Sequence, residues 1–291
     1  MADTKKKVKS RSQWAEVWRR LVRNKGAMIG MAIVLILTMI ACFADAIFDY
    51  EAEIIAQDIP NRYIEPCKEH WFGTDKLGRD VFKRLLYGAK YSLLIGFSAT
   101  LFSTCIGLVL GSIAGYFGGK ADLLIMRFCD IWGAVPSLLL GMIIVSLLGP
   151  SVVNLVVAMG LGGLAGKSRT VRAAVLTVRN SEYVESARAI GMPEWKIIAK
   201  YILPNCLSPI IVSVTLGVAS DIISASSLSF LGLGVQQPAP EWGAMLSAAR
   251  DDLRYYPYLA TFPGIAIMIT VLAMNMFGDG IRDAMDPKLR R

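Results

Sequence analysis

Residues 131–166 read IWGAVPSLLLGMIIVSLLGPSVVNLVVAMGLGGLAG, a run of 36 positions without a charged side chain. A helix needs roughly 20 apolar residues to cross the hydrocarbon core of a bilayer, so this run is too long for one crossing. Gly149-Pro150-Ser151 lies near its middle and is typical of a turn. We therefore expect two short membrane helices, over 134–149 and 151–167.

The rest of the chain supports the same class. Of its 291 residues, 54% are hydrophobic and 19% are charged, and the mean hydropathy is +0.49. Soluble domains usually carry about a quarter charged residues, so a membrane protein is favoured. Further apolar runs predict spans over 27–48, 92–117, 207–231 and 258–279. We expect an all-α integral membrane bundle of six transmembrane helices.

The first apolar run could also belong to a signal peptide. It starts about 26 residues into the chain, and no small-residue cleavage site of the usual form precedes Asp45. We interpret it as a retained membrane anchor. The basic stretch before it and an interfacial helix over 14–24 make up residues 1–26.

Basic residues separate by membrane side. With the N-terminus inside, six spans return the C-terminus inside. The inner segments 1–26, 118–133, 167–206 and 280–291 then hold 22 Lys and Arg, whereas the outer segments 49–91 and 232–257 hold 9, against 11 acidic residues. This asymmetry is what the positive-inside rule predicts. The net charge of +8 thus reflects topology and contact with membrane lipid, and we expect no nucleic-acid partner.

Catalytic and metal-binding signals are weak. His70 is the single histidine, and the five cysteines show no CxxC spacing, so we expect no metal site. Gly160–Ser168 is similar to a phosphate-binding loop, but Leu161 stands where that loop needs glycine, and the segment ends an apolar span. We therefore expect a chain that is not an enzyme and carries no cofactor of its own.

The inner segment 181–204 has the pattern of two short helices with a sharp corner. Gly191 suits the left-handed position that ends a helix, and Pro193 suits the first turn of the next one. A rigid corner of this kind, projecting into the cytosol, has a good shape for docking into a groove of another subunit.

This segment resembles the "EAA" loop of type I ABC importer permeases, in which Glu-Ala-Ala precedes glycine and then Ile-x-Leu-Pro. Ser186 and Tyr201 are mild departures from that pattern. In the family, the loop rests on the ATPase subunit. The resemblance implies a coupling role for Glu185, Ser186, Ala187, Gly191, Met192, Pro193, Leu203 and Pro204.

Three other segments resemble the dipeptide/oligopeptide/nickel subfamily of these permeases, and specifically its C-type subunit. They are Phe72–Asp75 with Gly78–Val81, Ser227–Gly234 with Pro240–Gly243, and Gly278–Asp283 with Asp286-Pro287. The resemblance implies a type I ABC importer permease fold over 92–280 after an extracytoplasmic loop over 49–91, with a cytosolic tail over 281–291. It also implies a B-type permease partner, two ATPase subunits that hold ATP and Mg, and an extracytoplasmic substrate-binding protein.

Several individual residues have more than one reading. Gly107, Gly111 and Gly115 lie four apart, which predicts close helix packing. Asp221 lies inside a span and could pack against Ser224 or a neighbouring helix, or face the pathway. Glu241 and Trp242 could contact a binding protein or form an ordered surface turn.

The function expected from these features is a permease for di- or oligopeptides in the cell inner membrane. A nickel or metal-chelate permease of the same subfamily is the first alternative. A stand-alone channel or secondary carrier is the alternative from another class, and the long inner loop counts against it. A membrane-embedded enzyme lacks a triad, a metal cluster or an acid pair within the spans.

Overall fold

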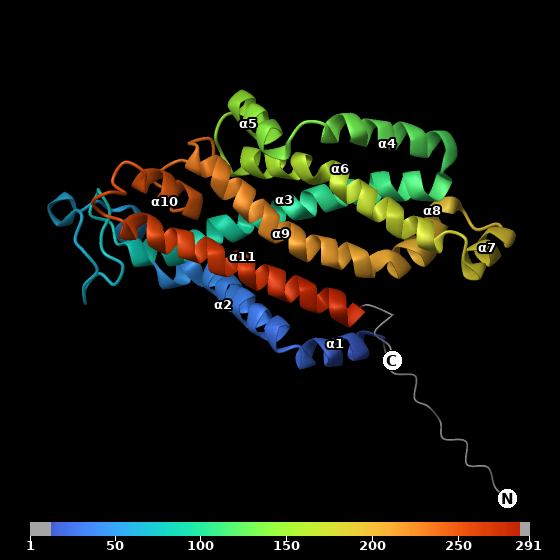
Figure 1. Cartoon of the computed structure of the whole chain (residues 1–291), viewed down its shortest axis with the longest axis horizontal. Coiled ribbons are helices and arrows are strands. Elements are labelled where there is room, and N and C mark those ends of the chain that lie inside the picture. The colour runs from blue at the N-terminus through green and yellow to red at the C-terminus, as the bar shows by residue number, and fades with distance from the viewer. Residues whose placement is uncertain (1–12, 286–291) are drawn as a thin grey trace, which may run out of the picture.

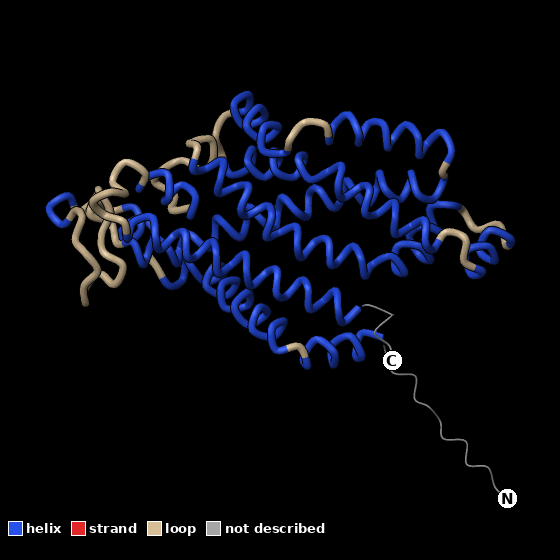
Figure 2. Tube along the Cα trace, viewed as in Figure 1, coloured by secondary structure: helices blue, strands red, loops and turns tan. Residues whose placement is uncertain are grey.

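A computed structural model describes residues 13–285. Long helices lie side by side along the longest axis of the molecule, and most of the loops gather at one end (Figures 1 and 2). No β-strand occurs between residues 13 and 285, where a single bridge joins Thr74 to Asp80. The predicted all-α bundle is therefore confirmed.

Seven helices make up the body of the bundle. They are α2 (Lys25–Ile47), α3 (Val81–Phe117), α4 (Gly119–Gly133), α5 (Ser137–Leu148), α6 (Val152–Val178), α9 (Leu207–Phe230) and α11 (Tyr258–Met285). Shorter helices connect or flank them: α1 (Gln13–Arg23), α7 (Glu182–Ala189), α8 (Glu194–Ile197) and α10 (Trp242–Ala249). Short π and 3-10 turns at Tyr50–Ile55, Ile59–Asn61, Ile198–Ile202 and Leu203–Cys206 complete the chain.

Four helical segments within residues 13–285 are long and apolar enough to cross a membrane: Lys25–Ile47, Val81–Phe117, Glu194–Phe230 and Tyr258–Met285. A fifth is present if α4 and α5, which meet at an angle of 80°, count as one bent span. At a rise of 1.5 Å per residue, α6 would reach about 40 Å, but its second half carries Lys167, Arg169 and Arg172. The predicted number of six spans is therefore not confirmed.

The structure corrects the sequence interpretation around the bend. The segment 118–133, which we expected to be an inner loop, is helix α4, with Leu124 70% and Ile131 75% exposed as on a lipid-facing surface. The predicted span over 134–149 reduces to α5, whose 12 residues would cover only about 18 Å. Pro136 lies between the two helices and lacks the backbone N–H that would continue α4.

Helix α6 continues 11 residues beyond the predicted end of its span at 167. Charged side chains in this extension find partners on the neighbouring helix α4. Arg169 lies 2.9 Å from Asp130, and Arg172 lies 2.5 Å from Asp122. These pairs hold the charged second half of α6 against the bundle beyond the predicted end of the span.

The predicted glycine face joins α3 to α6. A methyl group added at Gly107 would lie 2.7 Å from Cβ of Lys167, and one at Gly115 would lie 2.9 Å from Cβ of Val175. Between them, a methyl group at Gly111 would lie 2.5 Å from the carbonyl oxygen of Ser168. The backbones of the two helices therefore touch where side chains are absent.

The two ends of the bundle differ. Helices α7 and α8 project at one end, while α10 and the segment 49–80 lie at the other (Figure 1). Helix α1 lies toward the α7 end and packs on the bundle through Leu21, which is buried with Ala27 and Ala284. The predicted basic stretch 5–11 and the Asp286-Pro287 motif lie outside the described residues.

Candidate functional site

The corner between α7 and α8 is built by a helix-ending hydrogen-bond pattern. Gly191 has φ +73°, and its N–H donates to the carbonyl of Arg188 at 2.9 Å. The N–H of Met192 donates to the carbonyl of Ala187 at 3.2 Å. This pair of bonds is the Schellman motif, which glycine favours because it has no Cβ to clash in the left-handed region. Pro193 then occupies the N-cap position of α8.

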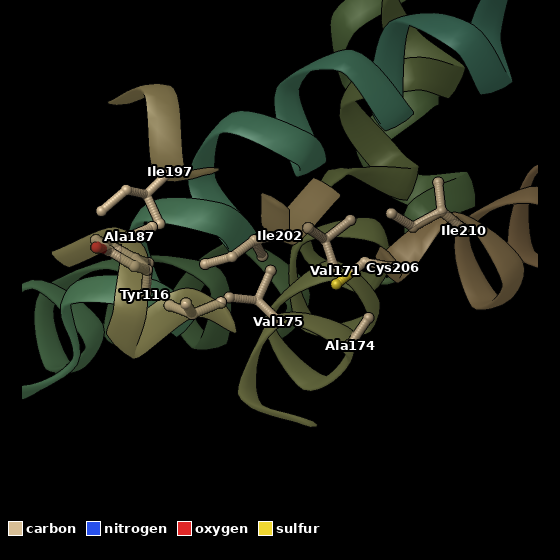
Figure 3. Packing of buried hydrophobic residues seen from close by; sticks show 10 residues of the cluster. Tyr116, Val171, Ala174, Val175, Ala187, Ile197, Ile202, Cys206 and Ile210 are labelled. Atoms are coloured by element: carbon tan, nitrogen blue, oxygen red, sulfur yellow. The ribbon is translucent and has the colours of Figure 1, made fainter. Parts of the chain in front are cut away.

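A buried apolar cluster fastens the corner to the bundle (Figure 3). Val184 and Ala187 of α7 and Ile197 of α8 enter it, and none is more than 3% exposed. The bundle contributes Tyr116, Val171, Ala174, Val175, Ile202, Cys206 and Ile210. The corner therefore moves with the adjoining ends of α3 and α6.

Tyr116 at the end of α3 links both helices of the corner. Arg188 of α7 donates to the Tyr116 hydroxyl at 3.2 Å, and its guanidinium lies 4.8 Å from the ring centroid. The same hydroxyl donates to the carboxylate of Glu194 on α8. Sequence reasoning missed these three residues, although Arg188 and Glu194 flank the predicted turn with opposite charges.

Removing the Tyr116 hydroxyl is expected to loosen the corner. Tyr116→Phe leaves the ring in place but removes two hydrogen bonds, one of them to a carboxylate, which stabilise it by about 1–3 kcal/mol. Amide hydrogen exchange in residues 182–197, measured by mass spectrometry, should accelerate by about tenfold or more. Tyr201→Phe is the matched control because Tyr201 packs on the same cluster and its hydroxyl makes no hydrogen bond within residues 13–285. Equal exchange in the two variants would contradict the link.

The predicted coupling residues divide into an inward and an outward set. Ala187 is buried, and Met192 and Leu203 are half-buried against the bundle. The exposed ones are Glu185, Ser186, Gly191, Pro193 and Pro204. Large apolar side chains are exposed beside them: Ile190 is 75%, Trp195 66% and Tyr183 41% exposed. Such a patch at the tip of a projection is typical of a protein interaction surface.

Asp221 lies in the middle of α9 and is half-buried. Its carboxylate accepts a hydrogen bond from Thr100 of α3 at 2.5 Å, whereas the expected Ser224 partner makes no such bond within residues 13–285. Nearby, Lys167 of α6 donates to the hydroxyl of Ser213 at 3.0 Å and to the Ser213 carbonyl. Sequence reasoning considered Lys167 only as part of a failed phosphate-binding loop.

Glu241 and Trp242 are each 1% exposed. The Glu241 carboxylate caps α10 by accepting from the N–H groups of Gly243 at 2.9 Å and Ala244 at 2.8 Å. The Trp242 indole donates to the carbonyl of Leu85 at 2.9 Å. The expectation of a direct binding-protein contact does not hold for these side chains, because both are buried with hydrogen-bond partners, Ser92 and Leu85, on helix α3.

Two enclosed arginines join the segments at the α10 end of the bundle to each other. Arg79 donates to Asp75 at 2.7 Å and to the side-chain oxygen of Gln237 at 3.2 Å. Arg84 donates to the carbonyl of Ile54 at 2.6 Å and to that of Pro238 at 3.1 Å. These bonds tie the segment 49–80 to the segment 232–241, so this end forms one connected surface.

Burial raises the pKa of Glu241 above its ordinary value, against the opposing effect of its hydrogen bonds. The folded protein therefore takes up a proton more readily than the unfolded chain. The contribution of this group to stability is full below about pH 4.3, the ordinary value, and is lost as pH rises through the raised pKa. The thermal midpoint of Glu241→Gln minus that of the wild type should therefore increase as pH rises from 4.5 to 7.5.

Glu53→Gln is the matched control of opposite sign. Its partner Lys83 lies 2.5 Å away and lowers the pKa of Glu53. A lowered folded-state pKa means stability that is present at neutral pH and lost as pH falls. The contribution of Glu53 is complete above about pH 4.3, the ordinary value, so the relative midpoint of Glu53→Gln should stay nearly level from pH 4.5 to 7.5. Equal slopes for the two variants would contradict the assignment.

Residues 13–285 contain no group of three or more His, Cys, Asp or Glu side chains placed to hold a metal ion. The segment 160–168, which is similar to a phosphate-binding loop but lacks its glycine at Leu161, is continuous helix within α6 and offers no loop of free backbone N–H groups.

A multi-helix membrane bundle with a fastened helical corner at one end is the architecture of a transport permease. Among solved structures, it is similar to the inward-facing MetNI methionine ABC transporter, with a TM-score of 0.58 and 18% identity over 70% of this chain and 97% of that one. It is also similar to an amino acid ABC transporter crystallised with histidines, with a TM-score of 0.53 and 14% identity over 69% and 94% of the two chains.

Residues 107–291 match the family of binding-protein-dependent transport system inner membrane components, and the chain belongs to that family. Residues 12–66 match the N-terminal membrane domain of oligopeptide transport permease C. The chain is 44% identical to the glutathione transport system permease protein GsiD of Pectobacterium atrosepticum, over 96% of this chain and 93% of that one. It is 45% identical to the dipeptide transport system permease protein DppC of Alkalihalophilus pseudofirmus, over 96% and 91%. It is a multi-pass inner membrane protein.

Proposed function

We propose that this chain is the C-type permease subunit of an ABC importer for short peptides, a class that includes dipeptides and glutathione. Relatives with 44–45% identity over 96% of the chain carry the names of dipeptide and glutathione permeases. A neighbouring permease chain completes the pathway, and two ATPase subunits bind ATP and Mg and hydrolyse ATP. This chain itself is not an enzyme.

The observation that carries the proposal is the projecting corner at α7–α8, with Ile190 and Trp195 exposed beside Glu185. We assign this surface as the seat of one ATPase subunit. Movement of that subunit reaches α3 through Tyr116 and reaches α9 through the continuous helical segment Glu194–Phe230. This connection supports alternating access, in which ATP-driven closure of the ATPases reorients the helices around the substrate.

The orientation follows from the two ends of the bundle. The corner and helix α1, with its basic Arg20 and Arg23, lie toward one end, which we assign to the cytosol together with both termini. The opposite end receives the extracytoplasmic binding protein. Since Glu241 and Trp242 are enclosed, we assign that contact to the surface around Trp71 and Ile59, which are 64% and 45% exposed.

Reconstitution tests the proposal. The chain is co-purified with the permease, ATPase and binding-protein subunits encoded beside it and placed in proteoliposomes. We expect ATP-dependent uptake of radiolabelled alanyl-alanine or glutathione and none without ATP. Uptake of nickel without peptide would contradict the peptide assignment, and uptake by the chain alone without ATP would contradict the importer assignment.

A further inference from the structure

One side of α9 carries Ser213, Gly217 and Asp221 at intervals of four residues, so these positions lie above one another on one face. Lys167 of α6 reaches this row. Its ammonium bonds to Ser213, and a methyl group added at Gly217 would lie 2.6 Å from it. Thr100 of α3 approaches the same glycine, 3.0 Å from that added methyl group. Three helices therefore meet around a lysine and an aspartate.

The two charges act on each other at a distance, but neither forms a direct ion pair in the described part of the chain. Two other charged side chains of α6, Arg169 and Arg172, are paired with aspartates of α4. By contrast, neither Lys167 nor Asp221 lies within 4 Å of an opposite charge in residues 13–285. Ionisable groups inside a membrane are costly, and those that persist usually line a pathway or bind a ligand.

An open groove begins at Ser213, the partner of Lys167, although neither Lys167 nor Asp221 lines it. It has a volume of about 400 Å³ and lies between α6, α9 and α11, at the ends of these helices that carry Thr170, Ser208 and Arg282. Ser213 lines this groove and also holds the ammonium of Lys167. Pockets for small molecules usually measure about 300–1,000 Å³. Polar side chains thus continue from the groove to Lys167.

The signs of the charges suit a short peptide. The ammonium of Lys167 rests at Gly217, one helical turn before Asp221. A free dipeptide carries a carboxylate and an ammonium group, whose charges are opposite to those of the two side chains.

We propose that Lys167 and Asp221 line the translocation pathway and contact the two charged ends of the peptide, the lysine its carboxylate and the aspartate its amino group. The proposal rests on the proposed function for the identity of the substrate. It assigns a specificity role to this chain in addition to the selection made by the binding protein. Thr100 and Ser213 position the two charges between substrate passages.

The first experiment measures uptake of alanyl-alanine by the reconstituted importer with its binding protein saturated, so that capture is equal in all variants. Lys167→Gln and Asp221→Asn are expected to lower the uptake rate by about tenfold or more, since each removes a charge-assisted hydrogen bond. Lys167→Arg, which keeps the charge, should restore most of the rate. Lys120→Gln, at an exposed lysine at the start of α4, is the matched control and should stay within about twofold. Wild-type rates in both neutral variants would overturn the proposal.

The second experiment does not depend on the peptide assignment. Lys167→Cys and Asp221→Cys are made in a chain whose five native cysteines are replaced, and the complex is treated with a charged, water-soluble methanethiosulfonate reagent. Labelling at both positions, slowed by the substrate that the importer carries, is expected. Absence of labelling would overturn the pathway assignment even if the neutral variants transported poorly or failed to accumulate. If the wild-type importer takes up another substrate and no peptide, the proposed function fails, and labelling alone then decides whether these residues line the pathway.

Discussion

Gly191→Trp is expected to lower uptake by the reconstituted importer by more than tenfold while leaving the chain inserted and assembled. Gly191 sits at the tip of the α7–α8 corner, and a side chain added there would meet no atom of this chain within 4 Å. The indole must therefore project from the surface that carries Ile190 and Trp195. A tenfold fall in uptake corresponds to a loss of about 1.4 kcal/mol in the free energy that couples the ATPase to transport. Uptake and ATP hydrolysis are measured on the same proteoliposomes.

The Gly191→Asn variant distinguishes a loss of transport caused by blocked docking from one caused by backbone strain. A residue with a Cβ pays roughly 1–2 kcal/mol in the left-handed conformation, but asparagine tolerates it well and often ends helices in this way. The Asn variant should therefore keep the corner and transport within about twofold of wild type. Normal transport by the Trp variant would exclude the corner as a docking element. Equal losses in both variants would instead indicate that the backbone shape is the sensitive feature.

Gly111→Leu is expected to destabilise the chain by about 3 kcal/mol or more, at the upper end for overpacked cores. The first carbon of its side chain would lie 2.5 Å from the backbone oxygen of Ser168 and 2.7 Å from Cβ of Val171. Neither atom is the end of a flexible side chain, so α6 would have to move away from α3. The thermal midpoint of the chain purified in detergent measures the loss.

Gly166→Leu is the matched control on the opposite helix. Gly166 is helical like Gly111, but it is exposed, and nothing lies within 4 Å of its added methyl group. Leucine favours helix over glycine by up to about 1 kcal/mol, so the midpoint should stay level or rise. A similar fall in both variants would show that added bulk, and not the α3–α6 contact, causes the loss.

Local chemistry explains why some features were predictable. The turn at Gly191 follows from a glycine and a proline two residues apart, because both residues act on their own backbone. The packing face at Gly107, Gly111 and Gly115 follows from helical spacing. The apolar runs likewise predicted α2, α9 and α11, since the bilayer sets the length of a crossing.

The ends of the helices depend on contacts between elements. Hydropathy ended the predicted fourth span at 167, and helix α6 continues beyond it with Arg169 and Arg172 paired to aspartates of α4. The same method counted 118–133 as an inner segment between spans, and that segment is a helix with an apolar exposed side. A count of charges along the chain cannot reveal which of them will be neutralised by a neighbouring helix.

The candidate sites likewise combine residues that the sequence identifies with residues that only the tertiary structure brings in. The coupling segment was identified from its motif, but its attachment to α3 depends on Tyr116, 72 residues before Arg188 in the chain. Lys167 became part of a site only because Gly217, on another helix, leaves space for its ammonium. Glu241 and Trp242 could have made a surface contact by sequence, but in the structure both are buried against helix α3.

Membrane class, charge sidedness and the helical corner are therefore consequences of sequence alone, because each depends on composition or on residues close together in the chain. The tertiary structure decided where helices bend, which charges pair and which residues stay open to a partner or substrate. Those properties depend on contacts between α3, α4, α6 and α9, whose spacing is set by backbone packing at the glycines. Asp221 and Lys167 show the result most clearly: each is an isolated charge in the sequence, and the fold brings the ammonium of Lys167 to Gly217, one helical turn before Asp221.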